Sequence, residues 1–77
     1  MKKVTIYSTP NCHFCHAAKD FFKENNIEYT DYNVAEDAEK RKEMMEKTGQ
    51  MGVPVIFIDG KMVIGFDRSK LKKFLSL

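Results

Sequence analysis

This 77-residue sequence has only two cysteines, almost no excess of charge and no long apolar run. Its 13 basic and 11 acidic residues are interspersed, which argues against a surface that binds nucleic acid or a membrane. The apolar stretch that follows Lys3 stops at Pro10, so it is too short for a signal peptide or a membrane span. We therefore expect a cytoplasmic protein whose cysteines are usually reduced and which binds neither nucleic acid nor membrane.

The scarcity of cysteine also limits what Cys12 and Cys15 can do. A disulfide between them would close a loop of about four residues, and such a short loop adds little stability. A tetrahedral zinc site needs more ligands, but His13 and His16 lie on the same turn and no second ligand pair follows. The C-x-x-C-H spacing also matches a c-type haem attachment signature, although such a protein would be exported and mostly helical. A structural disulfide, zinc and haem are therefore the weaker alternatives to a thiol redox centre.

Strand and helix patterns alternate along the chain. Short runs of β-branched and aromatic residues indicate strands, and apolar residues at helical spacing indicate helices. Asp59-Gly60 lies between two apolar runs and predicts a tight hairpin, and Asp67 is the expected N-cap of the last helix. The expected strands are residues 3–8, 27–34, 55–58 and 62–64, and the expected helices are residues 13–25, residues 36–48 and the segment after Asp67.

This order of elements predicts a single α/β domain over residues 1–77 with the topology βαβαββα. A strand-helix-strand unit joins two parallel strands, whereas the two strands of a hairpin are antiparallel. We therefore expect a four-stranded mixed sheet with helices on its faces. The helix of residues 36–48 has few apolar side chains, and among them Met44 and Met45 are expected to pack against the core.

The position of the two cysteines, after a strand and at the start of a helix, favours the redox interpretation. If Cys12 is the N-cap, its sulfur lies beside unpaired backbone N–H groups at the positive end of the helix dipole, which favours the thiolate. Cys15 would lie within disulfide reach of Cys12 but would be more shielded. Cys12 is then the attacking thiolate and Cys15 the resolving thiol. We interpret His13 as a solvated residue, whereas His16 could equally tune the thiolate or be solvated.

Three stretches of the chain together resemble the glutaredoxin family of the thioredoxin superfamily. They are YSTPNCHFC after the first strand, GVPVIFIDGK around the hairpin, and IGFDRSKL before the last helix. The resemblance implies a thioredoxin-like fold and a nucleophilic Cys12. It also implies that the bond between Val53 and Pro54 is cis and lies beside the active site, where the Val53 backbone pairs with an extended substrate.

Several positions differ from the glutathione-dependent members of that family. Those proteins commonly have Pro and Tyr where this chain has His13 and Phe14, and they often have Lys where Thr9 stands. Their Gly-Gly and following Asp pair are replaced by the segment GFDR, residues 65–68. This segment is similar to that of NrdH-redoxins, glutaredoxin-like proteins that accept electrons from thioredoxin reductase.

We therefore expect a glutaredoxin-like dithiol-disulfide oxidoreductase that acts by thiol-disulfide exchange through Cys12 and Cys15. We expect no bound cofactor, electrons from glutathione or from a flavoprotein of the thioredoxin reductase type, a disulfide-containing protein as substrate, and a monomer. The alternative from another class is a glutaredoxin-like module that binds an iron–sulfur cluster through Cys12 and added thiols.

The expected substrate-binding residues flank the cysteines in the folded chain. Phe14 and Phe66 are candidates for an apolar rim, and the alternative for Phe14 is packing of the helix against the sheet. The full set of expected substrate-binding residues is Val53, Pro54, Phe14, Phe66 and Asp67.

Overall fold

The computed structural model describes residues 3–77, so Met1 and Lys2 of the expected domain lie outside the described residues. The helices and strands follow one another in the predicted order. They are β1 (Val4–Ser8), α1 (His13–Glu24), β2 (Thr30–Asn33), α2 (Ala38–Thr48), β3 (Val55–Ile58), β4 (Lys61–Ile64) and α3 (Arg68–Leu75). The predicted topology βαβαββα is therefore confirmed.

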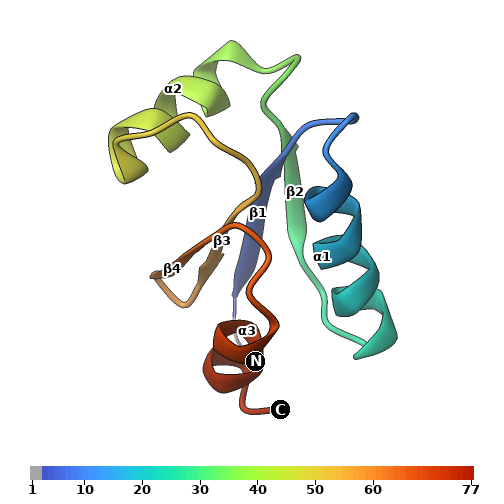
Figure 1. Ribbon diagram of the computed structural model, residues 1–77. Coiled ribbons are helices and arrows are strands. Elements are labelled where there is room, and N and C mark those ends of the chain that lie inside the picture. The colour runs from blue at the N-terminus through green and yellow to red at the C-terminus, as the bar shows by residue number, and fades with distance from the viewer. Residues whose placement is uncertain (1–2) are drawn as a thin grey trace.

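The strands form one mixed sheet in the order β2-β1-β3-β4 (Figure 1). β1 is parallel to β2, with Tyr7 opposite Tyr32, and antiparallel to β3, with Tyr7 opposite Val55. β3 and β4 form the predicted hairpin, in which Asp59 and Gly60 have φ angles of 51° and 85°. Both angles lie in the left-handed region, which Gly adopts freely and Asp tolerates, so the Asp-Gly pair suits this turn.

Helices cover both faces of the sheet because successive strand residues point to opposite sides. On one face, Ile6 packs with Phe22 of α1 and Leu71 of α3. On the other face, Tyr7 packs with Met44 of α2. In Figure 1, α2 accordingly lies on the side of the sheet opposite to α1. None of the helices within residues 3–77 is long and apolar enough to span a membrane.

The strand β2 begins three residues later than the sequence pattern predicted, at Thr30 instead of Ile27. The Ile27 backbone N–H donates to the Phe22 carbonyl at 2.8 Å, and Asn26 has a positive φ of 57°. This turn ends α1 with a 6→1 hydrogen bond, which uses the Ile27 N–H and keeps the residue out of the sheet.

The helix α2 also begins later than predicted, at Ala38 instead of residue 36. Asp37 is its N-cap, because the Asp37 carboxylate accepts a hydrogen bond from the Lys40 backbone N–H at 3.0 Å. The prediction that both methionines of α2 pack against the core is half wrong. Met44 is buried, but Met45 is 42% exposed, because the adjacent helix position points away from the sheet.

Polar contacts supplement Met44 in holding α2 to the sheet. The hydroxyl of the buried Tyr7 donates to Glu43 Oε1 at 2.6 Å. Lys40 and Lys47 form ion pairs with the same carboxylate at 3.2 and 3.3 Å. The hydrogen bond from Tyr7 and then the two ammonium groups lower the pKa of Glu43 to about 2.

Candidate active site

The start of α1 places Cys12 at the N-cap, as the sequence predicted. Cys12 has an extended backbone, and its Sγ accepts a hydrogen bond from the Cys15 backbone N–H at 3.1 Å. The first turn of the helix, residues 13–16, contains no acidic side chain that would repel a negative charge on this sulfur. The Cys12 sulfur therefore lies at the positive end of the helix dipole, in contact with a backbone N–H group.

The second sulfur lies in a different environment. Both thiols are free, but Cys15 is fully buried whereas Cys12 is partly exposed. Burial, and after it the hydrogen bond with Cys12, raise the pKa of the Cys15 thiol to about 12. At neutral pH, Cys15 is therefore a protonated thiol beside a more accessible sulfur. This difference suits an attacking Cys12 and a resolving Cys15.

The aromatic residue between the cysteines lies on the surface. Phe14 is 60% exposed, and its ring meets the ring of His13 edge to face with 5.6 Å between centroids. The alternative that Phe14 packs the helix against the sheet is therefore wrong. Its role as part of an apolar rim stays a prediction.

The two histidines of the first turn are both exposed, but they differ in their contacts. His16 Nε2 donates to the Pro10 carbonyl oxygen at 2.8 Å. This hydrogen bond joins the helix to the loop that carries Cys12, so His16 braces that loop. His13 contacts the Phe14 ring, as described above, and points toward solvent.

Val53 and Pro54 come to the same end of the sheet as the cysteine loop. β3 is antiparallel to β1, so the start of β3 lies beside the end of β1, from which the chain runs on to Cys12. The Val53–Pro54 bond is cis, as the resemblance implied. Pro54 is buried and Val53 is half-buried, and their contact with a substrate stays a prediction.

Phe66 and Asp67, the other two residues expected to bind substrate, follow β4. The chain that leads to them passes near Pro54, because the Gly65 backbone N–H donates to the Pro54 carbonyl at 2.8 Å. The half-buried Phe66 ring packs edge-on against Phe21, with 6.1 Å between centroids. The Asp67 carboxylate accepts from the Lys70 backbone N–H at 3.1 Å, which confirms Asp67 as the N-cap of α3. Both residues thus have structural partners, and their roles in substrate binding stay predictions.

A further polar group near Cys15 was not predicted from the sequence. The Ser8 hydroxyl donates to Asp31 Oδ1 at 2.6 Å, and Lys19 Nζ lies 2.6 Å from Asp31 Oδ2. The sequence holds one signal for Lys19, namely its spacing of four residues from Cys15, which places both residues on the same side of α1. Its pairing with Asp31 depends on the packing of α1 against β2, which the sequence pattern does not show.

The two cysteines have few partners that could hold a metal. Within residues 3–77, no group of three or more His, Cys, Asp or Glu side chains is placed to hold a metal ion. An iron–sulfur cluster would therefore need ligands from outside this set, since Cys12 and Cys15 supply at most two thiolates.

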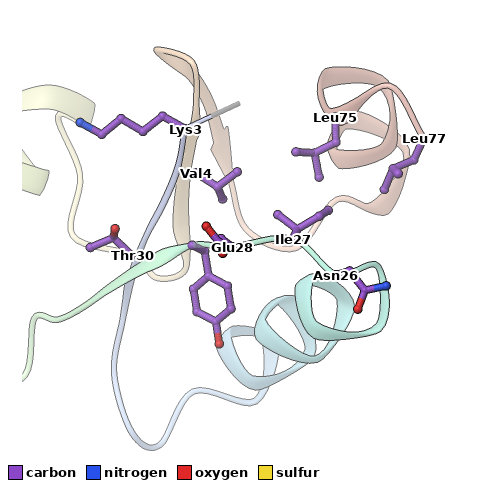
Figure 2. A pocket seen from close by; sticks show the side chains of 9 residues that line it. Lys3, Val4, Asn26, Ile27, Glu28, Thr30, Leu75 and Leu77 are labelled. Carbon is purple, nitrogen blue, oxygen red and sulfur yellow. The ribbon is translucent and has the colours of Figure 1, made fainter. Parts of the chain in front are cut away.

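A cavity of about 540 Å³ lies at the other end of the sheet (Figure 2). Figure 2 shows Ile27 and Leu75 facing the same space, with Val4 at the start of β1 on another side. Because Cys12 follows the end of β1, this cavity is separate from the thiols. Geometry and chemistry therefore place the candidate active site at the cysteine loop and not in the cavity.

Comparisons with known proteins show the family to which the chain belongs. The profile of the glutaredoxin family matches residues 4–63. The chain is 43% identical over 72 residues to a glutaredoxin-like 8.6 kDa protein in the rubredoxin operon of Clostridium pasteurianum, and the match covers 94% of this chain and 96% of that protein. It is also 34% identical over 67 residues to glutaredoxin 3 of Escherichia coli K12, and this match covers 87% of this chain and 81% of that protein.

The solved structures show the same relationship. The crystal structure of the thioredoxin-like protein BC3987 matches with a TM-score of 0.87 and 33% identity, over 94% of this chain and 99% of that one. The fold is therefore thioredoxin-like, and the C-x-x-C site is that of a redox protein. The chain belongs to the glutaredoxin family.

Proposed function

We propose that the protein is a dithiol-disulfide oxidoreductase that reduces protein disulfides through Cys12 and Cys15. The observation that carries this proposal is the difference between the two sulfurs. Cys12 is partly exposed and its Sγ accepts a hydrogen bond from a backbone N–H at 3.1 Å, whereas Cys15 is fully buried. Family membership supports thiol-disulfide exchange in general.

The reaction proceeds in two exchange steps. The Cys12 thiolate attacks one substrate sulfur, forms a mixed disulfide and releases the other substrate sulfur as a thiolate. Cys15 then loses its proton and attacks Cys12 Sγ, which breaks the mixed disulfide and forms the Cys12–Cys15 disulfide. The electron pair of the broken bond stays on the second substrate sulfur. The substrate thereby gains the two electrons and two protons that the cysteines lose.

The proposed substrate site surrounds the Cys12 sulfur. The Val53 backbone before the cis Pro54 would pair with an extended protein substrate, and Phe14 would supply exposed apolar surface at 60% exposure. Phe66 and Asp67 would complete the site on the α3 side. We also propose that the protein acts as a monomer in the cytoplasm and needs no bound cofactor.

We propose that a flavoprotein of the thioredoxin reductase type reduces the protein more effectively than glutathione does. Glutathione carries two carboxylates, which need charge-assisted hydrogen bonds to offset their lost hydration. Thr9 supplies only a hydroxyl at a position where related proteins often have Lys. The cations that could compensate already contact rings, because Arg68 lies 5.7 Å from the Phe21 centroid and Lys61 lies 5.2 Å from the Phe74 centroid.

This preference is tested by reducing the oxidised protein in two parallel assays, one with thioredoxin reductase and its cofactor and one with millimolar glutathione and its reductase. We expect the flavoprotein to reduce the Cys12–Cys15 disulfide faster. Thr9→Lys, which supplies an ammonium, should raise the rate with glutathione but not the rate with the flavoprotein. A wild-type protein that is reduced faster by glutathione would show that Thr9 in place of Lys does not exclude the tripeptide.

A further inference from the structure

Three polar side chains from three elements form a chain next to the active-site helix. We call Lys19 of α1, Asp31 of β2 and Ser8 of β1 the charge chain. One Asp31 oxygen accepts from the Ser8 hydroxyl and the other pairs with the Lys19 ammonium, each at 2.6 Å. Ser8 is only 1% exposed, and the side chains of Lys19 and Asp31 are 19% and 35% exposed. A lysine that served only solubility would extend into water instead.

The charge chain lies beside the resolving cysteine. Lys19 follows Cys15 by four residues on α1, so both side chains project from the same side of the helix. A backbone hydrogen bond from Thr9, and to a smaller extent the positive charge of Lys19, lower the pKa of Cys15. Burial and the Cys12 sulfur act in the opposite direction and dominate.

The resolving step needs such a charge. Cys15 is fully buried, and burial disfavours the thiolate that must attack Cys12 Sγ. A cation in a partly desolvated position offsets this cost more than a cation in bulk water does, because the attraction is less screened. Fixing a long lysine side chain costs rotamer entropy, and the ion pair with Asp31 compensates for that cost.

We propose that the charge chain holds the Lys19 ammonium one helical turn from Cys15 and thereby accelerates the resolving step. This inference rests on the proposed function. Lys19 transfers no proton in this step, and it acts as a positioning residue by its charge. The proton of Cys15 passes to solvent, and the electron pair of the broken mixed disulfide leaves with the substrate thiolate.

The test uses a neutral dipyridyl disulfide, which releases one chromophoric thiol when Cys12 attacks and a second when Cys15 resolves. Lys19→Met should slow the second release on the order of threefold at pH 7 and leave the first release unchanged. The effect is modest because the variant has less Cys15 thiolate, but each Cys15 thiolate is a stronger nucleophile. Lys19→Arg should restore the second rate because it keeps the charge. Lys23→Met, which removes an exposed lysine from the last turn of the same helix, is the matched control and should change neither rate.

Asp31→Asn tests the holding role of the charge chain. The ion pair that fixes the Lys19 side chain is lost, so the second release should become slower, while the first release and the circular dichroism spectrum of the folded protein stay unchanged. Equal second-release rates in the wild type and Lys19→Met, or an unchanged second-release rate in Asp31→Asn, would overturn the inference while the proposed function stands. A wild-type protein that releases no thiol at all would overturn both.

Discussion

At the residue scale, the chemistry depends on where each sulfur lies relative to the first turn of α1. Cys12 precedes the helix, so its sulfur meets a backbone N–H that has no partner within the helix. Cys15 lies inside the helix and faces the core, where burial raises its pKa to about 12. Two identical side chains three positions apart thereby differ in exposure and in their electrostatic surroundings, as the proposed attacking and resolving thiols require.

This difference predicts selective alkylation of the reduced protein. One equivalent of iodoacetamide at pH 7 should label Cys12, because Cys15 is buried and burial raises the pKa of its thiol to about 12, far above that pH. Peptide mass spectrometry assigns the label. In guanidinium, where the core is lost, both cysteines should react at similar rates. Preferential labelling of Cys15 in the folded protein would contradict the assignment of the two thiols.

The sequence could predict the positions of the two cysteines and their difference in burial, because both depend on local features, namely a strand, a helix start and the C-x-x-C spacing. It could not predict that Lys19 pairs with Asp31, since these residues come from different elements and meet only when α1 packs against β2. The cis bond before Pro54 came from the family resemblance, because an X-Pro bond has an intrinsic preference for trans.

At the scale of elements, α2 depends on few contacts. Met44 is its one buried residue, and the hydroxyl of Tyr7 reaches Glu43 from the sheet. The helix pattern predicted the existence of α2 but not its first residue. The Asp37 side chain caps the helix, so α2 begins after Asp37 and does not extend back to residue 36. The pattern also could not distinguish Met44 from Met45, since the narrow apolar stripe of this helix defines its buried side poorly.

The two methionines therefore offer a matched pair of substitutions. Met44→Ala should lower the free energy of unfolding by about 2–5 kcal/mol, because it leaves a cavity against Tyr7 and Val55. Met45→Ala should change it by no more than about 0.5 kcal/mol, because the side chain is already 42% exposed. Urea unfolding monitored by circular dichroism measures both. Equal losses would mean that α2 packs in another orientation.

At the scale of the whole molecule, the candidate active site and the cavity lie at opposite ends of the sheet. The cysteine loop and the start of β3 meet at one end, whereas the cavity near Ile27 and Leu75 lies at the other (Figures 1 and 2). The topology was predictable because parallel crossovers and Asp-Gly hairpins follow strong local rules. The packing of Phe66 against Phe21 was not, since it forms only in the assembled fold. The capping role of Asp67 was predictable, because it depends on a local pattern.

The most direct test of the central claim is to trap the mixed disulfide with single-cysteine variants. The account assigns attack to the accessible Cys12 and resolution to the buried Cys15. With a disulfide-containing protein substrate, Cys15→Ser should accumulate a covalent adduct that non-reducing electrophoresis and mass spectrometry assign to Cys12. Cys12→Ser should accumulate none, although it retains one thiol. An adduct on Cys15 in the Cys12→Ser variant, with none in Cys15→Ser, would contradict the account.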